Sequence, residues 1–264
     1  HGIFTFADDA KESYNRMIKY ITKAENELKK YSKPIKIKKY IEYKINASNL
    51  SNCIRSEIST PLLDRFQRKI VYFHNPKFLD EFFSHPNLAQ FVKQGPVTPD
   101  HVIRIKSKPL VLDFSKSKNH EIEKKLKNAI RKYINDYKKN FSKNHKYNKS
   151  AKILDPYPRL IAIKGVGIFS TGPTLKEAKI AMDVGLNSLS VILNASKFGK
   201  FTSIPEKEIF RMEYWPLELA KIKASSTRLK GTVTVITGGL GAIGYATTQK
   251  FKKEGSEIVV LDII

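Results

Sequence analysis

The amino-acid sequence predicts an α/β fold that is divided into more than one unit. Short apolar runs such as Lys69–Phe73 and Leu160–Ile163 alternate with longer segments in which apolar residues recur every three or four positions. With 264 residues, 41% of them hydrophobic, the chain can bury one large core or two smaller ones. Residues 232–261 have the order strand, helix, strand, which is typical of a parallel βαβ unit.

Composition and charge limit the class of protein. The chain has one cysteine, Cys53, and lacks an apolar run of about 18 residues, so we expect no internal disulfide, no membrane span and a cytoplasmic location. The net charge of +23 raises nucleic acid or an anionic membrane surface as a partner. Most of the cations are Lys, whereas Arg is the usual reader of phosphates and guanine edges. We therefore expect neither nucleic acid nor a membrane as the partner.

The first helix is predicted at residues 10–31. Asp9 and Glu12 have the spacing of a capping box, so Asp9 is expected at the N-cap, and Pro34 stops the helix. We interpret residues 1–6 as a strand end or loop that leads into this helix. Its apolar stripe consists of Ala10, Tyr14, Met17, Ile21, Ala24, Leu28 and Tyr31.

A second group of elements follows a basic linker. We predict a helix at residues 46–68, a buried strand at Lys69–Phe73, and a helix that begins at Asn75-Pro76. Residues 95–99 are predicted to form a turn, and Pro109–Leu112 a short strand.

The lysine-rich segment 114–152 is predicted to contain a helix with its charge on one face. The apolar stripe on the other face consists of Leu126, Ile130, Tyr133, Tyr137 and Phe141. Because the aromatic side chains belong to this stripe, they are not free to stack on bases, and we interpret the segment as a solvated helix. A polyanion-binding site remains the alternative.

The remaining elements form two further groups, separated by the polar segment Ser225-Ser226-Thr227, which we interpret as a linker between domains. The expected elements are a strand at Leu160–Ile163, a loop or strand at Val166–Ser170, a helix at 174–197, a strand at Thr232–Ile236, a helix at Gly241–Glu254 and a strand at Glu257–Leu261.

The most specific motif is TGGLGAIG at Thr237–Gly244, between a predicted strand and a predicted helix. Glycines at such a turn let a pyrophosphate approach the backbone amides at the helix N-terminus. Asp262 ends the next strand, 24 residues after Gly238, where a carboxylate can accept hydrogen bonds from ribose hydroxyls. The predicted dinucleotide site consists of Gly238, Leu240, Gly241, Ile243, Gly244 and Asp262.

The spacing T-G-x-x-x-[A/G]-x-G resembles that of the short-chain dehydrogenase/reductase family, with Ala242 where many members have Gly. The resemblance covers residues 230–264 and implies NAD as cofactor and the first βαβ of a Rossmann fold. Asp262 favours NAD over NADP because its carboxylate repels a 2′-phosphate. The catalytic Ser, Tyr and Lys of that family lie further along, so no catalytic residue is assigned.

The segment HGIFTFADDAKESY at the start resembles the last conserved block of the class II aldolase/adducin family. In that family the histidine is the third zinc ligand, so the resemblance implies that His1 is a metal ligand and zinc a cofactor. Phe6 and Ala7 depart from the family pattern, which has Trp and Gly. The other two zinc histidines and the acid/base carboxylate of the family precede this block.

Three further blocks, at 95–112, 154–169 and 208–223, resemble the family of bifunctional rhamnulose-1-phosphate aldolase/alcohol dehydrogenases. The resemblance implies an internal fragment of a sugar-catabolic enzyme of rhamnose catabolism, inactive by itself. The parent would use zinc to cleave a ketose 1-phosphate and NAD to oxidise or reduce the aldehyde or alcohol. Its expected partners are a sugar phosphate, an aldehyde and further copies of itself in a homo-oligomer. The alternative is a non-catalytic adducin-like or basic polyanion-binding module.

His101 and Arg104 lie in the first of these blocks. Either residue could bind a phosphate or a sugar. The neighbouring Thr98 and Asp100 favour instead a structural turn before an extended segment.

An internal comparison relates the two aldolase-like regions. Shifting residues 1–17 by 165 positions pairs His1 with Val166, which cannot bind a metal, so we interpret the second region as a degenerate copy. We expect three domains, at 1–45, 46–224 and 225–264. The identical pairs are Gly2 with Gly167, Ile3 with Ile168, Phe4 with Phe169, Lys11 with Lys176, Glu12 with Glu177 and Met17 with Met182.

Overall fold

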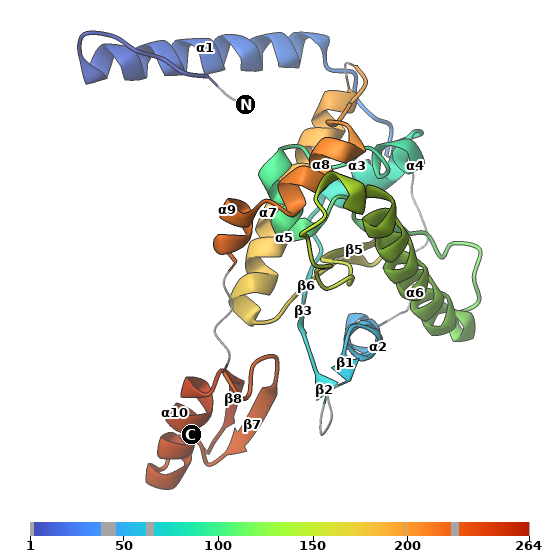
Figure 1. Cartoon of the computed structure of the whole chain (residues 1–264), viewed down its shortest axis with the longest axis vertical. Coiled ribbons are helices and arrows are strands. Elements are labelled where there is room, and N and C mark those ends of the chain that lie inside the picture. Colours follow the sequence, from blue (N-terminus) through green and yellow to red (C-terminus); the bar gives the residue numbers. More distant parts are fainter. Residues whose placement is uncertain (1–2, 38–45, 62–65, 198, 223–226, 264) are drawn as a thin grey trace.

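A mixed four-stranded sheet lies at the centre of the chain, in the order β3-β6-β5-β4. The β3–β6 and β6–β5 pairs are antiparallel, and β5–β4 is parallel. The computed structural model describes residues 3–37, 46–61, 66–197, 199–222 and 227–263 (Figure 1). The strands of this sheet are β3 (Ile70–His74), β4 (Leu110–Leu112), β5 (Leu160–Ile163) and β6 (Gly167–Gly172).

Helices cover both faces of the sheet. Successive strand residues point to opposite faces, so Ile161 and Ile163 of β5 pack with α2 and α6, whereas Leu160 and Ala162 pack with α3, α5 and α7. This layering confirms the expected α/β class. The helices of this part of the chain are α2 (Ala47–Glu57), α3 (Phe78–Ser84), α4 (Leu88–Phe91), α5 (Val102–Ile105), α6 (Asn119–Asn144), α7 (Leu175–Ser196), α8 (Glu206–Glu213) and α9 (Pro216–Ala220), with 3-10 turns η1 (Pro99–His101) and η2 (His145–Tyr147).

The predicted first helix is confirmed as α1 (Ala10–Tyr31), with Asp9 at its N-cap. The carboxylate of Asp9 accepts a hydrogen bond from the Glu12 amide at 2.8 Å. None of the residues of α1 is buried by the described part of the chain, and the helix extends away from the sheet (Figure 1).

Helices α1 and α7 have the same length and the same kind of cap. Each has 22 residues, and α7 begins and ends 165 positions after α1. The N-cap Thr174 accepts a hydrogen bond from the Glu177 amide, as Asp9 does from the Glu12 amide. The offset of the internal sequence comparison therefore holds over the caps and both whole helices.

The predicted helix at 46–68 is wrong beyond residue 57. Helix α2 ends at Glu57 and is followed by β1 (Thr60–Pro61) and β2 (Phe66–Gln67), which pair antiparallel. Thr60 precedes a proline, and the residue before proline is disfavoured in helical conformation. The extended segment expected after His101 is also wrong, because α5 occupies that position.

The last elements form a parallel unit of two strands and one helix. Strands β7 (Val233–Thr237) and β8 (Glu257–Leu261) pair in parallel through the connection α10 (Ala242–Lys253). This order agrees with the predicted elements. Contacts of the described residues connect the unit to the central part: Arg55 Nη2 donates to the Gly231 carbonyl at 2.7 Å, the Leu175 amide donates to Glu257 Oε1 at 2.8 Å, and Lys230 Nζ lies 3.9 Å from Glu177 Oε2. Most of the predicted linker lies outside the described residues.

None of the helices in the described part of the chain combines the length and the apolar character that crossing a bilayer requires.

Candidate functional site

The glycine-rich loop connects the end of β7 to the start of α10. Gly238 has φ +66°, a backbone conformation that residues other than glycine rarely adopt. A Cβ at this position would meet no atom within 4 Å. A Cβ on Gly244 would lie 1.9 Å from the Gly238 carbonyl oxygen, so the first turn of α10 packs directly on the loop backbone. The two glycines thus keep the loop close to the helix and leave its outer side open.

Asp262 joins the end of β8 to this loop. Its Oδ2 accepts a hydrogen bond from the Leu240 amide at 2.6 Å, and its Oδ1 accepts one from the Ile263 amide at 2.8 Å. Each carboxylate oxygen has a further lone pair that can accept from a hydroxyl group. The side chains of Leu240 and Ile243 are exposed. The structure therefore brings Gly238, Leu240 and Asp262 together at the carboxyl ends of two parallel strands.

The start of α10 has the features of an anion site. Its N-cap is Gly241, which provides no side-chain hydrogen bond to the first turn. The amides of that turn consequently keep their hydrogen-bonding capacity for a bound group, and the helix dipole favours a negative charge there. These residues fit the pyrophosphate and ribose of a dinucleotide.

The predicted zinc ligand His1 lies outside the described residues, as does Gly2. Within the described ranges there is no group of three His, Cys, Asp or Glu side chains that could hold a metal ion. Val166, which the internal comparison pairs with His1, lines a hollow of about 250 Å³ together with Asn75, Asp80 and Gly167. The described residues therefore contain no alternative set of zinc ligands.

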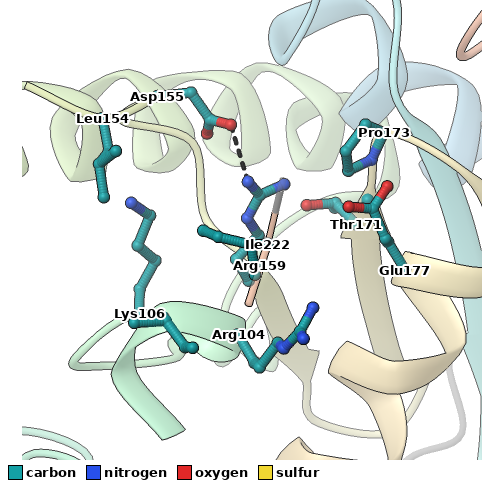
Figure 2. A pocket seen from close by; sticks show the side chains of 11 residues that line it. Arg104, Lys106, Leu154, Asp155, Arg159, Thr171, Pro173, Glu177 and Ile222 are labelled. Carbon is teal, nitrogen blue, oxygen red and sulfur yellow. Dashed lines mark hydrogen bonds and ion pairs between the residues drawn. The ribbon is translucent and has the colours of Figure 1, made fainter. Parts of the chain in front are cut away.

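A second candidate site is a cavity of about 210 Å³ beside the central sheet (Figure 2). Its walls come from the end of α5, the segment before β5, the end of β6 and the first turn of α7. The residues that line it are Ile103, Arg104, Lys106, Leu154, Asp155, Arg159, Thr171, Gly172, Pro173, Glu177 and Ile222.

Lys106 is the most constrained residue of this cavity. Its side chain is 5% exposed, and its backbone has φ +64° and ψ 173°, a combination that costs about 1–3 kcal/mol in residues other than glycine. The ammonium group lies 3.2 Å from Glu213 Oε1 and 3.0 Å from the Tyr137 hydroxyl. Burial lowers the pKa of Lys106, while the Glu213 carboxylate opposes that shift.

Asp155 lies between two further cations. Its Oδ2 is 3.0 Å from Lys69 Nζ and 2.7 Å from Arg159 Nη2. Burial alone would raise the pKa of Asp155, but the neighbouring Arg159 and Lys69 lower it to about 2. The carboxylate is therefore ionised and holds both cations in place.

No sequence pattern indicates the ionic cluster that Lys69, Lys106, Asp155, Arg159 and Glu213 form. Its members are spread over more than 140 positions, from Lys69 to Glu213, and no spacing connects them. Tyr137 was expected only as part of the apolar stripe of α6, and its hydroxyl group in fact donates to Glu213 at 2.8 Å. Of the residues that line the cavity, Arg104 is the one that the sequence analysis names as able to bind a phosphate or a sugar.

His101 and Arg104 have different surroundings. His101 Nδ1 lies 2.9 Å from the hydroxyl of Ser188, and Thr98 Oγ1 donates to Asp100 at 2.7 Å within the turn. Arg104 instead lines the cavity, and its Nη2 donates to the Lys221 carbonyl at 3.2 Å. Only Arg104 is thus positioned to meet a ligand there.

Comparison with known proteins defines the family. Residues 45–222 match the family described as "Aldolase class II, second domain", and the chain belongs to this family. The whole chain is also 26% identical, over 286 aligned positions, to the protein named "Uncharacterized oxidoreductase YuxG" of Bacillus subtilis (strain 168). The chain spans 39% of the length of that protein. No solved structure matches the chain.

Proposed function

We propose that the chain belongs to a fused sugar-catabolic enzyme with a class II aldolase activity and an oxidoreductase activity on one polypeptide. One observation carries this proposal: a domain of the class II aldolase family is followed directly by a parallel β7–α10–β8 unit with a glycine-rich loop and Asp262. The relative that aligns along the whole chain is named an oxidoreductase, which supports the second activity. The proposed domains are 1–45, 46–224 and 225–264.

The finer assignments rest on the sequence resemblances. A ketose 1-phosphate of the rhamnulose 1-phosphate type is the proposed aldolase substrate, with His1 as one zinc ligand. The second domain is proposed to be a degenerate aldolase-like unit, and the identical offset of helices α1 and α7 supports this relationship.

NAD is the proposed cofactor of the oxidoreductase part, where it would supply hydride transfer. The free amides at the start of α10 would bind its pyrophosphate, and Gly244 would keep the helix close to the loop. The carboxylate of Asp262 would accept hydrogen bonds from the ribose hydroxyls. This chain's own contribution is thus to bind and orient the dinucleotide.

Asp262 provides the test of this proposal. The carboxylate of Asp262 repels the 2′-phosphate of NADPH and leaves that charge without a partner, which costs about 1–3 kcal/mol or more and lowers the affinity about fivefold or more. We expect competition titrations with the 264-residue chain, monitored by NMR, to show weak binding that favours NADH over NADPH. Asp262→Ser should narrow the difference, whereas Asp136→Ser, at an exposed position of α6, should leave it unchanged.

Equal affinity of the wild-type chain for NADH and NADPH would contradict the assigned role of Asp262. Failure to bind either dinucleotide, in a chain whose amide spectrum shows a folded β7–α10–β8 unit, would contradict the cofactor assignment itself.

A further inference from the structure

The cavity beside α5 contains cationic groups that the neighbouring carboxylates do not neutralise. Lys106 is paired with Glu213, and Lys69 shares the single carboxylate of Asp155 with Arg159. Arg104 makes no ion pair with any residue that the structure describes; its hydrogen bond goes to a backbone carbonyl. The cavity therefore carries an excess of positive charge at its guanidinium groups.

Arg159 has an unused donor inside the cavity. Its Nη2 donates to Asp155, but its Nη1 is buried and has no hydrogen-bond partner among the described residues. Both arginines line the cavity, and Figure 2 shows Arg159 extending toward Asp155, whereas Arg104 extends from the wall formed by α5. A buried donor without a partner is rare in native proteins and indicates a bound group or water. The guanidinium fork matches the two oxygens of a carboxylate or phosphate.

The opposite side of the cavity provides an acceptor. Glu177 lies in the first turn of α7, and its Oε2 accepts a hydrogen bond from the Thr174 hydroxyl at 3.1 Å. Among the described residues Glu177 forms one ion pair, with Lys230 at 3.9 Å, so the carboxylate remains able to accept a hydrogen bond from a ligand hydroxyl. The cavity is also smaller than the roughly 300–1,000 Å³ of pockets that hold drug-sized ligands.

We propose that this cavity binds a small hydroxylated anion of a few carbon atoms. Arg104 and Arg159 hold its carboxylate or phosphate group, and Glu177 accepts a hydrogen bond from one of its hydroxyl groups. Lys106 and Asp155 fix the walls: Lys106 through Glu213, and Asp155 by holding Arg159 in position. The site lies within the second aldolase domain and needs neither NAD nor a metal ion, so it is independent of the proposed function.

Calorimetric titration of the 264-residue chain with three probes tests the proposal: inorganic phosphate, glycerol 3-phosphate and glycerate. We expect at least one hydroxylated probe to bind. Preference for glycerol 3-phosphate identifies a phosphate ligand, and preference for glycerate a carboxylate ligand. Arg104→Gln should weaken binding by about tenfold or more, since a charge-assisted hydrogen bond is lost. Arg211→Gln, on the exposed face of α8, is the matched control and should bind as the wild-type chain does.

Glu177→Gln separates the hydroxyl contact from the anion contact. This variant should weaken binding of the hydroxylated probes and leave inorganic phosphate unchanged or tighter, because a repelling charge is removed. If Arg104→Gln lowers the melting temperature, Arg104→Lys is tested in its place. This variant keeps the positive charge and loses only the two parallel N–H donors of the guanidinium group. Absence of binding by all three probes, or unchanged affinity in a folded Arg104 variant, would overturn the proposal.

Discussion

Gly244→Ala tests whether close packing between loop and helix holds the β7–α10–β8 unit together. The added Cβ would lie 1.9 Å from the Gly238 carbonyl oxygen, whereas ordinary contact begins at 3.4 Å, so the loop or α10 must move by about 1.5 Å. Overpacking costs about 1–3 kcal/mol, and this clash with backbone falls at the upper end. Alanine has a higher helix propensity than glycine, which offsets about 1 kcal/mol of this cost. The expected net loss of local stability is about 2 kcal/mol.

Amide hydrogen exchange of β7 and β8 measures this loss directly, because it reports local unfolding. A loss of about 2 kcal/mol accelerates exchange about 30-fold. Gly241→Ala adds the same methyl group to the same loop, where it would lie 3.5 Å from the Gly238 oxygen. Its cost, at the N-cap, is about 0.5 kcal/mol, or about twofold in exchange rate. Equal exchange rates in the two variants would refute the close-packing explanation.

Two further predictions concern the central domain. The pKa of Asp155 is lowered in the folded chain, so its contribution of about 2 kcal/mol is present above pH 3.8 and is lost as the pH falls toward 2. Asp155→Asn should lower the free energy of unfolding by at least about that amount at neutral pH, and urea denaturation across this pH range should show the difference vanishing in acid; a constant difference contradicts the assignment. Leu126→Ala empties a fully buried position in α6 and should cost about 2–5 kcal/mol, whereas Leu28→Ala, 45% exposed on α1, should cost less than about 0.5 kcal/mol. Similar denaturation midpoints for these two variants would show that α6 is not part of the core.

The elements that the sequence predicted well are those with a strong local signal. Strand β8 has the expected bounds, and Asp9 caps α1 as expected, because alternation and capping depend on a few neighbouring residues. The aromatic side chains of the α6 stripe pack within the domain, as in the contact of Phe141 with Phe210 at 5.9 Å between ring centroids. This packing is consistent with the solvated helix that we favoured over a polyanion site.

The elements that were missed depend on contacts between distant residues. The helix predicted at 46–68 is longer than α2 because the apolar spacing continues past Glu57, although Pro61 follows closely. Lys106 and Glu213 meet across 107 positions, and no local pattern indicates that either side chain is buried. A buried ion pair of this kind becomes visible only when the packing of α5 against α8 is known.

Helices α1 and α7 show that sequence periodicity does not by itself predict whether a helix is buried. Both have an apolar stripe, the same length and the same type of N-cap, so local rules predict two equivalent helices. Leu193 of α7 is 3% exposed against the central sheet, whereas Leu28, its counterpart 165 positions earlier, is 45% exposed. The same pattern is thus compatible with a buried and an exposed helix, because amphipathicity specifies a face but not the surface that covers it. The uncovered apolar face of α1 accords with the proposal, made from the sequence resemblances, that residues 1–45 belong to a domain separate from 46–224.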